Sequence, residues 1–181
     1  MAFGALGESA AAREAFEQAI ESDPEYEEAL YNLALNEKET DPQKAVELLE
    51  RAIEIDSDYA LAHHELGGLY EGLKDLTRAE YHFRRSLEID PANYWSGLFL
   101  ANVLAIEGRN EESEKMYRFA IGLRPELVGG FEFFARFLEF TGKVQEAATV
   151  RASAGLRFGG WPRPDDPKIT VPQISILGHE L

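Results

Sequence analysis

The chain has 181 residues, of which 45% are hydrophobic, and this is enough for one domain of ordinary size with a buried core. Its 33 acidic and 18 basic residues give a net charge of −15 and a pI near 4.7. Phosphate backbones and anionic lipids repel such a chain, so we expect no nucleic-acid partner and no membrane partner. A basic peptide or a positively charged protein surface is the better expectation, although the acidity also fits a role in solubility alone.

The absence of cysteine excludes disulfides, thiolate metal sites and cysteine nucleophiles, and it fits a cytosolic protein. The first residues, MAFGALGESAAARE, have neither the basic start nor the apolar centre of a signal peptide, and no apolar run is long enough to span a bilayer. These observations disfavour export but do not exclude a leader that preceded this start and was removed. We therefore expect a cytoplasmic protein, with no cofactor.

Short stretches that end helices recur along the chain. They surround Pro24, Ser57, Pro91, Pro125 and Gly159, at intervals of 33, 34, 34 and 34 residues. A period of 34 residues is that of the tetratricopeptide repeat, whose pattern is W-x2-L-G-x2-Y…A-x3-F…P.

The segment 60–93 follows this pattern with one change, His63 in place of the leading aromatic residue. The remaining matches are Leu66, Gly67, Tyr70, Ala79, Phe83 and Pro91. The chain therefore resembles the tetratricopeptide repeat family. The resemblance implies an all-α fold, a right-handed α-solenoid of helix-turn-helix repeats that stack to form a concave face, with a non-helical C-terminal tail.

The resemblance divides the chain into an array over residues 1–161 and a tail over residues 162–181. The array is expected to contain a partial repeat, 3–26, and repeats 27–59, 60–93, 94–127 and 128–161, with only residues 3–7 remaining of the first helix of the partial repeat. In chain order we expect helices over residues 9–22, 25–38, 42–55, 59–73, 75–89, 92–107, 110–122, 126–141 and 143–157.

The string HHELGG at residues 63–68 is similar to the H-E-x-x-H zinc signature of metalloproteases. In that signature two histidines four residues apart bind zinc, and the glutamate acts as the base. Here the second ligand position is Gly68, and no cysteine is available. The string is better explained as the Leu-Gly pair of a repeat, so we expect no metal site at His63, His64 or at His82, in the second helix of the same repeat.

In the resembled family, peptides lie in a groove formed by the first helices of successive repeats. Residues at the groove-facing positions form the candidate partner-binding site: Tyr31, Lys38, Leu61, His64, Trp95, Leu98, Asn102, Glu132, Arg136 and Phe140. Some family members clamp a peptide carboxylate with clustered Lys, Asn and Arg, because a buried carboxylate needs several donors. The matching positions here are mostly apolar or aromatic, and Lys38 and Asn32 alone do not make such a clamp.

The expected groove has an aromatic and apolar floor edged by glutamates. This predicts a partner that is an extended or helical segment with apolar anchors and positive charge, and exposed Trp or Tyr would be the anchors. Trp95 and Leu98 either line this groove or pack between adjacent repeats. Both alternatives are left open by the sequence.

The fifth repeat contains PELVGGFEFFARFLEF, a helix that is apolar on nearly all sides. Neighbouring repeats are expected to cover only part of it, and the tail is a candidate for the remainder. Prolines bar a helix in the tail, yet Ile169, Val171, Ile174, Ile176 and Leu177 make it too apolar for an ordinary disordered linker. A homodimer through the tail or through an exposed array end is left open.

The leading interpretation is a non-catalytic protein-protein interaction scaffold, an adaptor that binds a peptide segment or partner protein in its concave groove. The alternative is a regulatory or substrate-recruiting domain of a larger enzyme or assembly complex, which the partial first repeat favours. No nucleophile-base pair, phosphate-binding loop or ligand set lies outside positions that the repeat explains, so we expect no catalytic residues.

Overall fold

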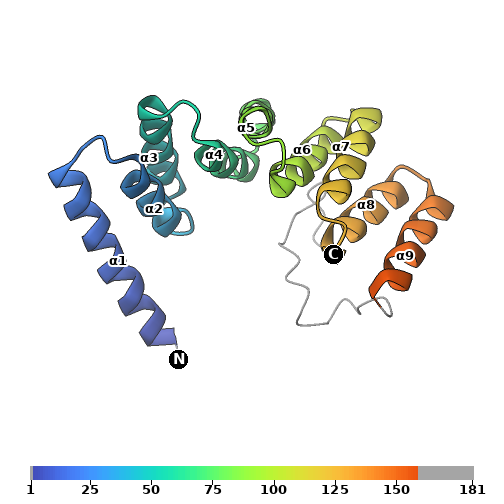
Figure 1. The fold of residues 1–181 in the computed structure, drawn as a ribbon, viewed down its shortest axis with the longest axis horizontal. Coiled ribbons are helices and arrows are strands. Elements are labelled where there is room, and N and C mark those ends of the chain that lie inside the picture. Colours follow the sequence, from blue (N-terminus) through green and yellow to red (C-terminus); the bar gives the residue numbers. More distant parts are fainter. Residues whose placement is uncertain (1, 159–181) are drawn as a thin grey trace. The chain divides into compact units, whose positions relative to one another are not determined.

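The computed structural model describes residues 2–158 of the chain, and the side chains of residues 10–155 (Figure 1). The described residues form helices and turns without strands. The helices are α1 (Ala2–Ser22), α2 (Glu27–Glu37), α3 (Pro42–Ile55), α4 (Ala60–Gly72), α5 (Leu76–Ile89), α6 (Tyr94–Ile106), α7 (Asn110–Leu123), α8 (Val128–Phe140) and α9 (Val144–Phe158). The all-α prediction is therefore confirmed, and the predicted C-terminal tail lies outside the described residues.

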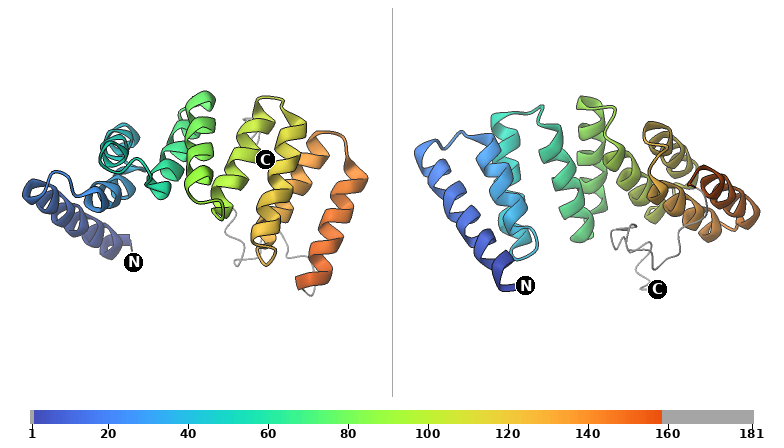
Figure 2. Two further views of the ribbon diagram at one scale, coloured as in Figure 1. Left: turned by 45° about the horizontal axis from the view of Figure 1, so that its top comes forward. Right: turned by 60° about the horizontal axis from the view of Figure 1, so that its bottom comes forward.

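The helices divide into two compact units, the first over Met1–Pro91 and the second over Ala92–Leu181. In the first unit α2 pairs with α3 and α4 pairs with α5, and α1 packs on α2. In the second unit α6 pairs with α7 and α8 pairs with α9, and Figure 2 shows both pairs as antiparallel hairpins. Each pair is one helix-turn-helix unit of the kind that the 34-residue period predicts.

The start of the chain differs from the prediction. We expected a helix from residue 9 and a separate remnant over residues 3–7, but α1 is continuous from Ala2 to Ser22. No proline interrupts this segment, and its alanines are the strongest helix formers. Gly4 and Gly7 each cost about 1 kcal/mol in a helix interior, and that cost does not break the helix here.

Short polar side chains mark the starts of three helices. The carboxylates of Asp41 and Asp75 accept hydrogen bonds from the backbone N–H groups of Lys44 and Arg78, at 3.0 and 3.1 Å. The side-chain oxygen of Asn93 accepts one from the N–H of Ser96 at 3.0 Å. These bonds satisfy N–H groups that lack a partner in the first turn, and so they define where α3, α5 and α6 begin.

Three turns inside hairpins share an unusual backbone shape. Lys74, Gly108 and Gly142 have φ values of 64°, 77° and 81°, and each lies 34 residues from the next. This left-handed region is open to glycine but costs other residues about 1 kcal/mol or more. The turns thus have the same geometry although one of them has a side chain.

The hairpins close because small residues lie where the paired helices approach. A Cβ atom built on Gly67 of α4 would lie 2.6 Å from two ring carbons of Phe83 on α5, so any larger residue would displace that ring. A Cβ on the neighbouring Gly68 would meet nothing within 4 Å. The glycine of the Leu-Gly pair in the tetratricopeptide pattern therefore lies at the position where the two helices leave no room for a side chain.

The aromatic helix α8 has both buried and exposed phenylalanines. Phe133, Phe134 and Phe137 are at most 3% exposed and belong to one core cluster with Tyr117 of α7. The rings of Phe134 and Phe137 lie 5.7 and 5.2 Å from the ring of Tyr117. Phe140 of the same helix remains 56% exposed. The predicted cover of α8 by the tail lies outside the described residues.

Candidate interaction surface

Two of the three histidines that were considered for a metal site, His63 and His82, contact each other. Nδ1 of His63 lies 3.0 Å from Nδ1 of His82, and Nε2 of His63 lies 3.3 Å from the carbonyl oxygen of Ser57. A carbonyl only accepts, so Nε2 of His63 carries the proton and its Nδ1 accepts the N–H of His82. This assignment holds for neutral rings, and burial favours neutral rings because it lowers the pKa of His63 and lowers that of His82 to about 4.

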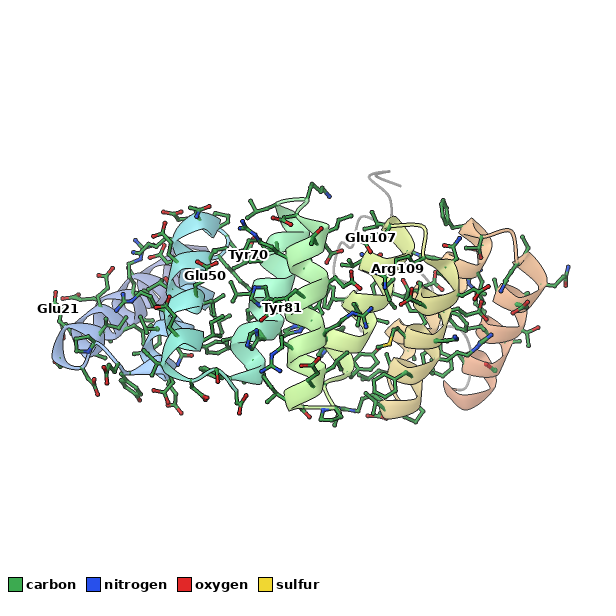
Figure 3. All side chains as sticks on the ribbon, turned by 90° about the horizontal axis from the view of Figure 1, so that it is seen from above. Glu21, Glu50, Tyr70, Tyr81, Glu107 and Arg109 are labelled. Carbon is green, nitrogen blue, oxygen red and sulfur yellow. The ribbon has the colours of Figure 1, made fainter. Side chains whose placement is uncertain are left out.

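This histidine pair belongs to the interior of the α4–α5 hairpin. The ring of Tyr70 stacks on His82 at 5.5 Å, and the Tyr70 hydroxyl donates to Glu50 of α3 at 2.6 Å (Figure 3). Within the described residues, no group of three or more His, Asp or Glu side chains is arranged to hold a metal ion. No helix in the described part of the chain is long and apolar enough to cross a membrane.

In the first unit, the predicted surface residues come from α2 and α4. Leu61 is 49% exposed, whereas the ring of His64 is half-buried and lies 5.8 Å from the ring of Phe83. Nζ of Lys38 lies 3.3 Å from a carboxylate oxygen of Glu65, which ties α2 to α4. Burial is the main reason why the pKa of His64 lies below its ordinary value. Of Leu61 and His64, the two predicted residues on α4, Leu61 is the one that exposes an apolar side chain to a partner.

Tyrosines extend this face toward the turns that precede α2 and α4. The rings of Tyr31 and Tyr59 lie 5.2 Å apart, and Tyr26 is 42% exposed. Burial and then the negative charge of Glu65 raise the pKa of Tyr31 to about 12. Burial also raises the pKa of Tyr59, followed by the charges of Glu28, Glu27 and Asp56.

We did not single out Tyr26 and Tyr59 from the sequence, although a signal was present. Each is the residue before the first helix of a repeat, and they lie 33 residues apart, one period of this segment. A comparison of the residues before each first helix would have found them.

In the second unit, the predicted residues of α6 separate into exposed and buried ones. Trp95 is 41% exposed, and its ring contacts Tyr94 edge-on at 4.9 Å and Phe99 at 6.3 Å. Leu98 and Asn102 are each 1% exposed. These two are core residues in the structure, so Trp95 alone of the three predicted residues on α6 is exposed.

Two of the three predicted residues of α8, Glu132 and Arg136, belong to an ion network with α9. Arg136 pairs with Glu132 on the same helix at 2.9 Å, and Arg151 of α9 pairs with Glu132 at 3.2 Å and also with Glu139. These carboxylates raise the pKa of Arg151, with Glu139 as the larger cause. The family pattern has an aromatic residue at position 151, and here a cation fills the position by bridging two glutamates of the facing helix.

Comparisons with known proteins agree with the repeat pattern. Models of the tetratricopeptide repeat match residues 1–35, 28–58 and 60–93. No curated protein matches the chain significantly.

Many solved structures share the fold. A crystal structure of MamA is 20% identical, with 83% of this chain and 88% of that chain covered and a TM-score of 0.75. TTC0263, a protein of Thermus thermophilus, is 22% identical over 87% of each chain, with a TM-score of 0.67. YrrB, described as a tetratricopeptide protein with an unusual peptide-binding site, is 16% identical over 83% of this chain and 78% of its own, with a TM-score of 0.68. At these identities the likeness establishes the fold alone.

Proposed function

Since the chain belongs to the tetratricopeptide repeat family, we propose that it is a non-catalytic scaffold that binds a peptide segment or a partner protein on its first helices. Proteins of this family generally present surfaces for other polypeptides rather than catalytic groups. The fold that the chain shares with MamA and YrrB supports the same class of function. The peptide-binding site named for YrrB supports a peptide as the ligand, although the low identity transfers no residue.

The observation that carries this proposal is a pair of equivalent exposed apolar side chains. Leu61 is the second residue of α4 and Trp95 is the second residue of α6, 34 residues later, and they are 49% and 41% exposed. A large apolar residue repeated at one exposed position is not needed by the core, whereas a partner can bury it. Trp is among the residues that most often dominate binding energy at protein interfaces.

Trp95→Ala tests the proposal in affinity capture from a cell extract, with the retained proteins quantified by mass spectrometry. The matched control is Phe119→Ala, because Phe119 is 42% exposed in the same unit but lies on the second helix of its hairpin, α7. We expect Trp95→Ala to weaken retention of specific partners about thirtyfold, as for the loss of an anchor worth about 2 kcal/mol.

The control should retain partners within about twofold of the wild type, which is within the scatter expected for a contact outside the interface. Circular dichroism confirms that both variants keep their helices. Equal retention by Trp95→Ala and the wild type, with the fold intact, would remove Trp95 as the anchor.

A further inference from the structure

The negative charge of the chain is confined almost entirely to the first unit. Residues 1–91 contain 22 acidic and 8 basic residues, a net charge of −14, whereas residues 92–181 contain 11 and 10, a net charge of −1. A need for solubility would be met by charge spread over both halves. A charge concentrated in one half selects the sign of the partner that this half can bind.

Within the first unit, exposed aromatic and apolar side chains gather where α2 and α4 begin. We call Tyr26, Tyr31, Tyr59 and Leu61 the tyrosine patch. Tyr26 and Leu61 are 42% and 49% exposed, Tyr31 and Tyr59 are half-buried, and the rings of Tyr31 and Tyr59 contact each other at 5.2 Å. The patch therefore offers ring surfaces and one aliphatic side chain to a ligand.

Carboxylates surround the patch without cationic partners. Glu27, Glu28 and Asp56 act on Tyr59 strongly enough to contribute to its raised pKa, and no ion pair among the described residues joins any of them to a Lys or Arg. The Tyr26 hydroxyl is 3.4 Å from a carboxylate oxygen of Glu28.

Cations near the patch are partly paired with other carboxylates. Lys38 pairs with Glu65 at 3.3 Å. Arg85 pairs with Glu88 at 2.6 Å and with Asp58, next to Tyr59, at 3.6 Å. A guanidinium group of Arg51 donates to the carbonyl oxygen of Pro24 at 3.5 Å. A bond to a neutral carbonyl leaves the charge of Arg51 beside the patch, where it offsets one of the three negative charges of Glu27, Glu28 and Asp56. The potential around the patch is therefore reduced by this cation but stays negative.

We infer that the tyrosine patch binds an arginine-containing peptide segment that also carries aliphatic side chains. This inference rests on the scaffold function proposed above and names the chemistry of its partner. A guanidinium group can stack on a tyrosine ring while its N–H groups are bonded by a carboxylate, which a lysine ammonium does less well. The aliphatic side chains of the segment pack against Leu61.

Other occupants fit the charges less well. A second copy of the chain carries a net charge of −15 and has no basic half, so it would be repelled. The last 23 residues, 159–181, contain two basic and three acidic residues and are not a basic segment either. Nucleic acid is excluded as a partner of this unit by the repulsion of its phosphates.

The test is a fluorescence anisotropy titration of the full chain with a labelled peptide in which arginine alternates with leucine. Companion peptides replace arginine with lysine or with glutamate. We expect binding of the arginine peptide that weakens with added salt, weaker binding of the lysine peptide, and none of the glutamate peptide.

The variant Glu27→Gln/Glu28→Gln/Asp56→Asn removes three charges from the rim of the patch. Its matched control, Glu14→Gln/Glu47→Gln/Glu54→Gln, removes three charges from exposed positions on α1 and α3. We expect the rim variant to weaken binding of the arginine peptide about tenfold and the control less than about twofold, since only the rim charges are in contact range. Leu61→Ser, at an exposed site that leaves the fold intact, should weaken binding of this peptide as well.

Equal weakening by the two triple variants, or no binding of the arginine peptide at low salt, overturns the inference. The result of this test can be distinguished from the result of the Trp95→Ala capture experiment. If Trp95→Ala loses its captured partners while the rim variant keeps them, the scaffold function holds and the partner binds elsewhere. If the arginine peptide binds as expected while Trp95→Ala retains every partner, the patch holds and the Trp95 anchor fails.

Discussion

The contact between His63 and His82 determines which nitrogen carries the proton in each neutral ring. Only one proton can lie between two nitrogens 3.0 Å apart, and the Ser57 carbonyl fixes which imidazole donates it. Burial lowers the pKa values of both histidines, and His63 and Arg78 act in the same direction on His82. His63, which replaces the aromatic residue of the family pattern, therefore makes the stability of the α4–α5 hairpin dependent on pH.

We predict that the chain loses stability as the pH falls from 7 to 5. The unfolded chain protonates His82 near pH 6.5, whereas the folded chain resists protonation down to about pH 4. Between these values the unfolded state binds more protons, so acid favours it, by about 2 kcal/mol at pH 5. Urea denaturation at a series of pH values measures the loss.

The variant His82→Gln separates this effect from the titration of carboxylates. The glutamine amide can still donate to Nδ1 of His63, but it takes up no proton. Its unfolding free energy should therefore change less between pH 7 and pH 5. An identical pH dependence in the variant would assign the acid sensitivity to other groups.

At the residue scale, the family pattern could predict which positions of the first helices are candidates for partner binding. It could not predict how exposed each side chain is. Trp95 and Leu98 were equally good candidates, and burial separates them into a surface residue and a core residue. Arg151 was visible only as a departure from the pattern, because its partners Glu132 and Glu139 lie on another helix. Long-range pairing of this kind depends on the packing of hairpins rather than on spacing.

At the element scale, the closeness of paired helices depends on single small residues. We predict that Gly67→Ala lowers the unfolding free energy by about 1–3 kcal/mol, because the added Cβ overlaps the Phe83 ring at 2.6 Å in a packed interior. Gly68→Ala is the matched control: its Cβ meets no atom within 4 Å, and alanine should stabilise α4 by up to about 1 kcal/mol.

Urea denaturation followed by circular dichroism measures both variants. Equal destabilisation by the two variants would contradict the prediction. It would mean that the contact between α4 and α5 does not determine the cost of a side chain at position 67.

The helices themselves were predictable because turns and small residues recur with the repeat. The predicted and observed bounds of α3 agree, and those of α4 and α5 differ by at most one residue. The start of α1 was wrong because the family pattern predicts a turn there, whereas the local residues favour a continuous helix. Local propensity decided the outcome where no proline or glycine-rich turn opposed it.

At the scale of the whole molecule, the two units differ most in charge. Carboxylates that outnumber cations repel each other in the folded first unit, and salt screens this repulsion. The second unit is nearly neutral and should respond much less.

We predict that salt stabilises α2–α5 selectively. Raising the NaCl concentration from about 0.01 to 0.15 M shortens the screening length from about 30 to about 8 Å. Amide hydrogen exchange measured by mass spectrometry should become slower in α2–α5, by several-fold, with α6–α9 as the internal control. An equal change in both units would show that the charge of the first unit does not limit its stability.

The left-handed turn residues carry a consequence for how such chains can grow. Lys74, Gly108 and Gly142 adopt one backbone shape although their side chains differ, so glycine is not required at this corner. A duplicated repeat would contain its own left-handed turn, so the longer array would need no new turn sequence. Lengthening by duplication is therefore compatible with lysine as well as with glycine at that corner.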